Sequence, residues 1–296
     1  MPRQRGPRGM TAATDTPAGQ HDLPDEDAVL GRASGENFSV ASLLLGRANR
    51  DRLMAIYGFA RLVDELGDSA PGDRAAHLDR LEVELERAYR GVATHPILTR
   101  LAPVIRDLGL PRELFARLIE ANRRDQQVTR YETFDDLLEY CLFSANPVGE
   151  LVLAVFGATD AERVALSDRV CTALQLAEHW QDVAEDRAAG RIYLPTEDMH
   201  RFDVTADDLD APATPAALRR LMAFEVDRAR ALLDEGAPLV GLLRGRARLA
   251  VAGYVGGGRA ALDALVAADF DVLAGPPRAG KGARVAASLR AFRTGR

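Results

Sequence analysis

The sequence has few of the residues that mark several common protein classes. Of its 296 residues only two are cysteines and one is tryptophan, and aromatic residues make up 6%. Cys141 and Cys171 form neither a CxxC spacing nor a Cys/His pattern, which excludes a disulfide scaffold and a zinc module. We expect both thiols to be buried and reduced, as is typical of a cytoplasmic protein.

Long apolar runs and strong positive charge are also missing. No uninterrupted apolar run reaches the ~20 residues that a bilayer-spanning helix needs. Arg3, Arg5 and Arg8 are followed by no apolar segment, so the N-terminus does not resemble a secretory signal. The net charge is −6 and no basic stripe is interleaved with aromatics, which argues against a nucleic-acid partner.

No strand-like alternation of apolar and polar residues persists anywhere in the chain. The glycine-rich run at 253–258 lies within a helical pattern rather than after a strand, so we reject a dinucleotide-binding loop. Apolar residues, 47% of the chain, instead recur with helical spacing in segments joined by short links. The sequence therefore predicts an all-α, single-domain bundle.

Three regions differ in composition. Residues 1–33 are rich in proline and glycine without periodicity and are expected to be a disordered leader, with Met1 and Met10 as alternative starts. Residues 34–274 carry the helical patterns. Residues 275–296 form a basic, amphipathic tail.

Two pairs of aspartates stand out in the helical region. Asp182 and Asp186 are four residues apart, and so are Asp64 and Asp68, which places each pair on one face of its expected helix. The pair Asp64 and Asp68 extends the apolar stripe of its helix, whereas acidic side chains on a surface helix usually lie opposite that stripe. Solvated helix turns would explain either pair alone.

Both pairs together favour a metal site. If the two helices pack antiparallel, four carboxylates face one cavity. Mg²⁺ in proteins takes one or two carboxylates and completes its shell with water and substrate phosphate oxygens. The pattern therefore indicates chemistry on a diphosphate ester.

The expected helices bearing these features have the following bounds. The first acidic helix covers about 49–68 and the second about 160–186. A helix over 134–156 should kink at Pro147, because proline removes a backbone donor and clashes with the preceding turn. The final core helix covers about 246–269.

Three segments carry a resemblance to a known family. They are IYGFARLVDELGD at 56–68, EYCLFSANPVG at 139–149 and QLAEHWQDVAEDRAAGRIYLP at 175–195. Over about residues 36–270 the chain resembles the squalene/phytoene synthase family of head-to-head isoprenoid synthases. The resemblance implies an isoprenoid-synthase-type helical bundle with a central apolar cavity, and two aspartate-rich helices that bind diphosphate through Mg²⁺.

The same resemblance implies roles for individual residues. The catalytic, metal-binding aspartates would be Asp64, Asp68, Asp182 and Asp186. Glu178 would be a further metal ligand, although relatives commonly carry asparagine there. The substrate-binding residues would be Tyr57, Arg61, Tyr140, Gln175, Arg191, Tyr193 and Tyr254.

Details of the motifs are similar to the hydroxysqualene synthase branch associated with bacterial hopanoid synthesis. They are ENFSVAS at 36–42, SANPVG at 144–149, and Trp180-Gln181 before Asp182, where carotenoid-forming relatives usually have arginine at the second position. The implied substrate is presqualene diphosphate, the implied cofactor is Mg²⁺, and no NADPH is expected. A presqualene diphosphate synthase and a flavin-dependent desaturase are the implied pathway partners.

Other functions remain open on the sequence. One is condensation of two farnesyl diphosphates to presqualene diphosphate, squalene or a carotenoid precursor. Another is a catalytically silent assembly factor, although all four aspartates are retained here. A helical-repeat scaffold lacks support because no 30–45-residue self-similarity is found.

The tail has its own hypothesis. It carries basic residues without an acid, and Val285, Leu289 and Phe292 are spaced as one helix face. This pattern suits peripheral contact with an anionic membrane, and a solvated terminal helix is the alternative.

Overall fold

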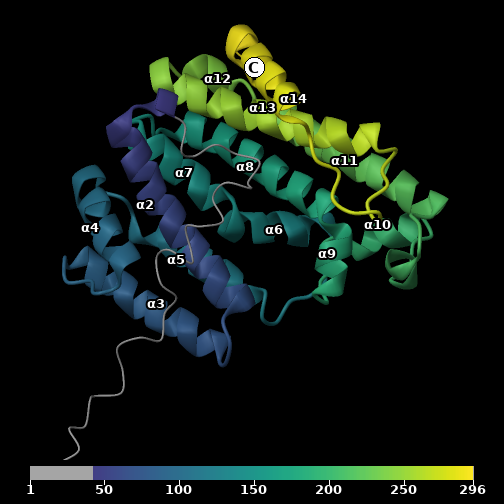
Figure 1. Cartoon of the computed structure of the whole chain (residues 1–296), viewed down its shortest axis with the longest axis horizontal. Helices are drawn as coiled ribbons and strands as arrows, with labels where there is room; N and C mark the ends of the chain where they lie inside the picture. The colour runs from purple at the N-terminus through teal and green to yellow at the C-terminus, as the bar shows by residue number, and fades with distance from the viewer. Residues whose placement is uncertain (1–42, 296) are drawn as a thin grey trace, which may run out of the picture.

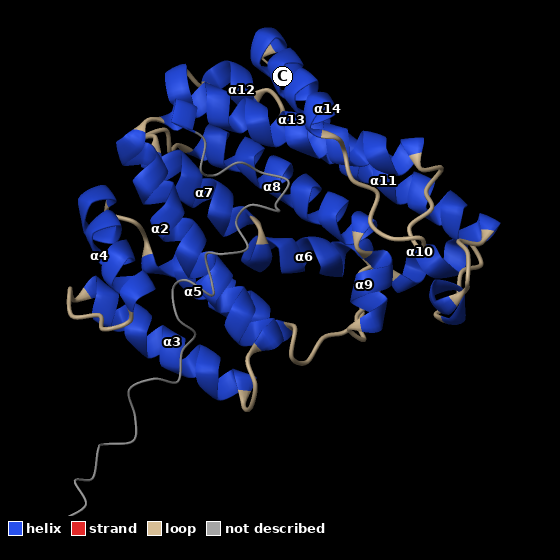
Figure 2. Cartoon of the chain, viewed as in Figure 1, coloured by secondary structure: helices blue, strands red, loops and turns tan. Residues whose placement is uncertain are grey.

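The computed structural model describes residues 43–295 (Figure 1). All regular elements in this range are helices, joined by loops (Figure 2). A single parallel bridge between Arg130 and Ile192 is the only strand-like pairing there. The all-α prediction is confirmed. The predicted leader, the alternative start at Met10 and the motif at 36–42 lie outside the described residues.

The described helices follow one another through short connections. In chain order they are η1 (Leu43–Leu45), α2 (Arg47–Asp64), η2 (Glu65–Ser69), α3 (Arg74–Tyr89), α4 (Pro96–Leu108), α5 (Arg112–Arg124), α6 (Phe134–Ser144), α7 (Asn146–Val155), α8 (Ala161–Gln181), α9 (Val183–Ala188), α10 (Thr196–Arg201), η3 (Asp207–Asp210), α11 (Ala216–Gly236), α12 (Leu239–Leu242), α13 (Gly245–Ala267) and α14 (Lys281–Thr294).

Two apolar clusters hold the bundle together. One joins the helices α2, α3, α4 and α5, and in it the fully buried rings of Phe59 and Phe115 meet edge to face with centroids 5.1 Å apart. The other joins α6, α8, α11 and α13 around the fully buried Trp180. Tyr254 packs against both clusters, and α7 contacts both α2 and α8. The space between the two clusters is where the site lies.

The expected helix over 134–156 is divided into α6 and α7. The break falls at Ala145, two residues before the predicted kink at Pro147. Pro147 occupies the first turn of α7, where a missing N–H costs no helical hydrogen bond.

Neither acidic pair lies on one regular α-helix, so that part of the prediction was wrong. The first acidic helix ends at Asp64 and continues as the π-helical turn Glu65–Ser69, which contains Asp68. The second ends at Gln181. Asp182 leaves helical geometry with φ −102° and ψ 18°, and Asp186 lies in the short helix α9. π-type turns inside helices occur frequently at functional sites.

Helix α14 packs along α13 at the edge of the molecule (Figure 1). The two backbones approach closely at Gly256, where a Cβ atom would come within 2.3 Å of the Ser288 nitrogen. Ala291 is buried in this contact. The apolar residues predicted to line one face of the tail point elsewhere: Val285, Leu289 and Phe292 are 59%, 50% and 37% exposed.

Two stretches are long and apolar enough to cross a bilayer by composition alone. They are Phe134–Val155, which the structure divides between α6 and α7, and Gly245–Ala267, which is α13. More than half of each apolar window is buried inside the bundle. Core helices of a bundle have this property without any membrane.

Candidate active site

Two adjoining cavities lie between the clusters. The larger, of about 540 Å³, is lined mainly by carboxylates, arginines and tyrosines, and the smaller, of about 230 Å³, mainly by apolar side chains. They share part of their wall: Tyr57, Ala60, Ser144, Val148, Gln175 and Glu178. A polar chamber thus opens next to an apolar one, as a ligand with a charged head and an oily body requires.

The residues predicted for the site are brought together here. All but one line the polar chamber: Tyr57, Arg61, Asp64, Asp68, Tyr140, Gln175, Glu178, Asp182, Asp186, Arg191 and Tyr193. The exception, Tyr254, lines the apolar chamber.

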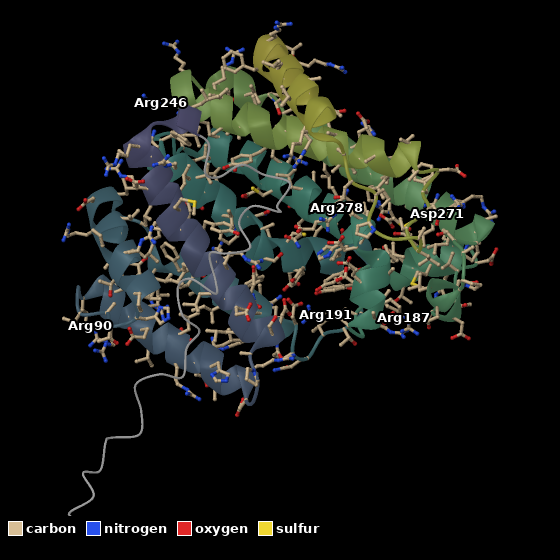
Figure 3. The ribbon with its side chains drawn as sticks, viewed as in Figure 1. Arg90, Arg187, Arg191, Arg246, Asp271 and Arg278 are labelled. Carbon is tan, nitrogen blue, oxygen red and sulfur yellow. The ribbon has the colours of Figure 1, made fainter. Side chains whose placement is uncertain are left out.

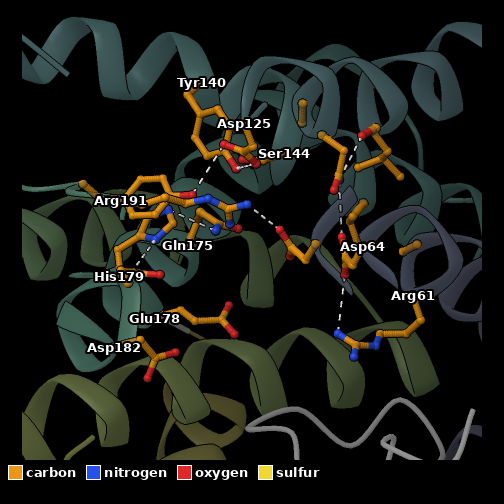
Figure 4. Close-up of a pocket in the computed structure, with 18 of the residues that line it drawn as sticks. Arg61, Asp64, Asp125, Tyr140, Ser144, Gln175, Glu178, His179, Asp182 and Arg191 are labelled. Atoms are coloured by element: carbon orange, nitrogen blue, oxygen red, sulfur yellow. Dashed lines mark hydrogen bonds and ion pairs between the residues drawn. The ribbon is translucent and has the colours of Figure 1, made fainter. Parts of the chain in front are cut away.

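Asp64 lies on one wall, at the end of α2 (Figure 4). Arg61 Nη1 is 3.5 Å from its Oδ2, and Asn122 Nδ2 donates to its Oδ1 at 3.5 Å. Burial raises the pKa of Asp64 to about 7, assisted by the negative charges of Asp68 and Glu178 and opposed by Arg61. The carboxyl lies deep in the protein, yet 46% of its side-chain surface faces the cavity, so water there offsets part of this effect.

Asp68 connects the two acidic segments. Its Oδ1 lies 2.5 Å from Nη2 of Arg191, which follows α9 and is distant in sequence. The π turn that positions Asp68 packs tightly on α5: a Cβ on Gly67 would come 2.0 Å from the Asn122 side-chain oxygen. Gln126 Nε2 also donates to the Gly67 carbonyl at 2.9 Å.

The opposite wall comes from the end of α8 and from α9. Figure 4 shows Glu178 and Asp182 across the cavity from Asp64 and Arg61. Burial raises the pKa of Asp182 to about 6, and the nearby charges of Glu178, Glu185 and Asp186 act in the same direction. Four carboxylates, those of Glu178, Asp182, Glu185 and Asp186, thus influence one another on this wall, and the positive charge of Arg278 opposes their effect on Asp182.

His179, for which the sequence shows no partner, is held in this wall. Its Nδ1 lies 3.8 Å from Asp186 Oδ2, and its Nε2 is 3.2 Å from Gln175 Nε2. The ring stacks on Tyr193 with a centroid separation of 3.7 Å. These contacts fix the aromatic wall of the chamber.

Asp125 is a site residue that the sequence analysis missed. It follows α5, lines the polar chamber and accepts a hydrogen bond from Tyr140 Oη at 2.7 Å and from Tyr193 Oη at 3.4 Å. Burial raises the pKa of Asp125, although the Tyr140 hydrogen bond and Arg191 oppose that shift. The available signal was the polar pair Asn122 and Asp125 at helical spacing, extending the apolar stripe of Leu118.

The donor set fits a hard cation. Within residues 43–295, no three carboxylate, imidazole or thiolate groups converge on one point. Mg²⁺ does not need such a cage, because it takes one or two carboxylates and keeps water and phosphate oxygens as its other ligands. Carboxylates with raised pKa values on both walls, Asp64 and Asp182, are the groups that a bound cation would stabilise in their charged form.

Comparison with known proteins agrees with this geometry. The family model for squalene/phytoene synthase matches residues 32–290. A hydroxysqualene synthase from Rhodopseudomonas palustris is 36% identical over 209 residues, covering 69% of this chain and 70% of the relative. A presqualene diphosphate synthase from the same organism is 34% identical over 214 residues, covering 71% and 76%.

A solved structure shows the same architecture. The crystal structure of squalene synthase HpnC from Alicyclobacillus acidocaldarius superimposes with a TM-score of 0.76 and 48% identity, covering 81% of this chain and 92% of that one. The family-model match covers most of the chain, and the relatives exceed 30% identity over two thirds of it. The chain belongs to the squalene/phytoene synthase family.

Proposed function

We propose that the protein is a hydroxysqualene synthase, which converts presqualene diphosphate and water to hydroxysqualene and diphosphate. One observation carries the proposal: a chamber with carboxylates on two walls opens directly onto an apolar chamber. The first suits a metal-bound diphosphate and the second suits an isoprenoid chain.

Mg²⁺ is the proposed cofactor. Asp64 and Asp68 would hold it on one wall, and Glu178, Asp182 and Asp186 on the other. Bound Mg²⁺ would neutralise the diphosphate and stabilise it as a leaving group. The longer, charged Glu178 can still supply a carboxylate oxygen.

The residues of this chain would act on each part of the substrate. Arg61 and Arg191 lie where they can donate charge-assisted hydrogen bonds to diphosphate oxygens. When the carbon–oxygen bond breaks, its electron pair leaves with the diphosphate and a carbocation remains. Tyr57, in the wall that the two chambers share, would lie where its ring can stabilise positive charge, and the apolar wall would exclude premature water.

The rest of the reaction balances without a reductant. The cyclopropane rearranges, one water adds to the resulting cation, and the added water loses a proton. No hydride is transferred, so NADPH is not required. The similarity to hydroxysqualene synthases, together with Gln181 before Asp182, supports this reaction over condensation of two farnesyl diphosphates, which remains the second candidate.

The test is product analysis by gas chromatography and mass spectrometry. Purified protein receives Mg²⁺ without NADPH, and either presqualene diphosphate or farnesyl diphosphate. Hydroxysqualene from the first substrate and no product from the second is the expected result, and Asp182→Asn should abolish turnover. A C30 or carotenoid-type product from farnesyl diphosphate would replace this proposal with the condensing reaction.

The substrate and the product both carry long apolar chains. Another enzyme must supply the substrate, and a further enzyme must consume the product. We place a presqualene diphosphate synthase before this protein and a flavin-dependent desaturase after it. We also place the protein in the cytoplasm, with peripheral membrane contact through α14. The outward Val285, Leu289 and Phe292 and the surrounding basic residues support that contact.

A further inference from the structure

Arg278 was assigned by sequence to the basic tail, but the structure places it elsewhere. Its side chain lines the polar chamber together with Arg61 and Arg191. Arg191 and Arg278, both labelled in Figure 3, come to this chamber from loops far apart in the sequence. The chamber therefore has a third arginine that no motif predicted.

The loop that carries Arg278, residues 274–280, is fixed at its start. Just before it, Asp271 Oδ1 accepts a hydrogen bond from Thr214 Oγ1 at 2.6 Å, and Asp271 Oδ2 lies 3.1 Å from Arg219 Nη2. Val272 is fully buried between these groups and the core. We call residues 274–280 the strap.

The strap is fixed along its length and at its end as well. Gly275 takes φ +118°, which favours glycine, and Pro276 and Pro277 restrict the backbone that follows. Gly280 is followed directly by α14, which packs on α13. The strap is thus a short loop with little freedom (the yellow loop in Figure 1).

Gln181 holds the middle of the strap. This side chain is 3% exposed, and its amide nitrogen donates to the carbonyl oxygen of Pro277, the residue before Arg278. Gln181 is also the residue before Asp182. The buried Gln181 amide therefore links the acidic wall, at Asp182, to the strap, which places the Arg278 guanidinium in the same chamber.

The charge of Arg278 is available for a ligand. In the described part of the chain no carboxylate lies within salt-bridge distance of its guanidinium, whereas Arg61 and Arg191 are paired with Asp64 and Asp68. Its positive charge does reach Asp182, where it opposes the rise in pKa. An arginine without a carboxylate pair in the polar chamber is suited to an anionic ligand.

We propose that Arg278 is a diphosphate-binding residue and that Gln181 is the positioning residue that holds the strap in place. The inference rests on the proposed diphosphate substrate. When diphosphate occupies the chamber, the guanidinium donates hydrogen bonds to its oxygens from the strap side. Arg61 reaches the same chamber from α2, and Arg191 reaches it from the loop that follows α9.

The test measures binding of inorganic diphosphate by isothermal titration calorimetry, with the full chain and Mg²⁺ present. Arg278→Gln should weaken binding about tenfold, the loss of one charge-assisted hydrogen bond, and Arg278→Lys should weaken it less. Arg90→Gln removes an exposed arginine at the other end of the molecule and should leave affinity unchanged (Figure 3). Equal affinity for wild type and Arg278→Gln would overturn the proposal.

A double-mutant cycle tests the positioning residue. Gln181→Leu should weaken diphosphate binding about threefold in the wild-type background and have no further effect in Arg278→Gln, because both changes remove the same contact. Additive effects would show that Gln181 does not act through Arg278. If Gln181→Leu proves unfolded, Gln181→Ser replaces it in the same cycle.

The outcomes separate this inference from the proposed function. If wild-type protein fails to bind Mg²⁺ and diphosphate, the proposed function fails. If wild type binds and Arg278→Gln binds equally well, only the role of Arg278 fails. A KM increase with a smaller change in kcat on the isoprenoid substrate is expected for Arg278→Gln.

Discussion

Glu225 is a buried acid far from the catalytic chemistry proposed above. Its side chain is 0% exposed, and neither carboxyl oxygen has a hydrogen-bond partner within residues 43–295. Arg228 Nη1 lies 3.5 Å away, but Arg228 donates its hydrogen bonds to the buried Asp198 at 2.9 and 3.3 Å. Burial raises the pKa of Glu225 to about 8, with Asp198 and Glu197 adding to the shift and Arg228 opposing it.

The shifted pKa predicts a pH-dependent stability. The ordinary pKa of 4.5 applies in the unfolded chain, so between about pH 4.5 and 8 the folded state keeps a proton that the unfolded state has lost. The free energy of unfolding should therefore fall as pH rises through this window. Glu225→Gln, which mimics the protonated acid, should reduce the fall between pH 5 and pH 8 by about 1–3 kcal/mol. Urea denaturation at the two pH values measures it.

A matched control lies on the same helix. Glu235 is exposed on α11 and pairs with Arg169 at the surface, so Glu235→Gln should change stability by less than about 0.5 kcal/mol at either pH. An unchanged pH dependence in Glu225→Gln would mean that Glu225 is ionised in the folded protein.

The sequence predicted which residues line the chambers better than it predicted which residues contact one another there. The aspartates of the two acidic pairs line the polar chamber, and the tyrosines that the family resemblance implied line one chamber or the other. Asp125 and Arg278 were missed because their positions depend on contacts across the fold, with Tyr140 and Gln181 respectively. Helical spacing places Asn122 and Asp125 on one face with Leu118, but it does not identify the residues of other elements that they contact.

At the scale of the element, helix type and order could be predicted, but interruptions could not. The apolar period continues through Asp64 and through Asp182, so nothing local marks either break. The π turn at 65–69 forms because α5 packs against it, and Asn122 and Gln126 supply its side-chain contacts. Tertiary packing overrides helical propensity at the π turn.

Gly67 is the residue on which this packing depends. A Cβ there would lie 2.0 Å from the Asn122 side-chain oxygen and 2.8 Å from the carbon that bears it. Gly67→Ala should therefore push the π turn away from α5 and displace Asp68. We expect a fall in Tm of about 5 °C, corresponding to a cost of about 2 kcal/mol, and weaker diphosphate binding. Thermal unfolding by circular dichroism and calorimetry measure the two effects.

Gly253 provides the comparison for this variant. It lies within α13, and a Cβ there would meet nothing within 4 Å. Gly253→Ala should keep or raise Tm, because alanine favours a helix by about 0.5–1 kcal/mol over glycine. A Gly67→Ala protein as stable as Gly253→Ala would show that the π turn tolerates a side chain.

At the scale of the molecule, the site exists because two apolar clusters leave a gap that neither fills. The helical periods in the sequence indicated one bundle, and the structure divides its core around α7. The tail forms a helix, as its spacing predicted, and the structure adds how this helix is held. The small residues Ala287, Ser288 and Ala291 allow a close approach of α14 to α13, and Phe292 lies with its ring 4.9 Å from the Arg248 guanidinium at the margin of this contact. Val285 and Leu289 are at least half exposed on the outer side of α14.

This outward face predicts binding to anionic vesicles. Val285, Leu289 and Phe292 are exposed beside basic residues, and no acid occurs between residues 275 and 296. A triple serine variant at these positions should bind phosphatidylserine-containing liposomes about a hundredfold more weakly in a flotation assay, since three apolar side chains that each contribute about 1 kcal/mol or more at an interface sum to about 3 kcal/mol. Substitution is preferable to deleting 275–296, because deletion also removes Arg278 from the polar chamber.

Two controls accompany this variant. Val83 is an exposed valine on α3, so Val83→Ser should float like wild type. Liposomes of phosphatidylcholine alone should bind the wild type and the triple variant poorly. Equal flotation of the triple variant and wild type would remove α14 as the docking element, and diphosphate binding by that variant should stay at the wild-type level throughout.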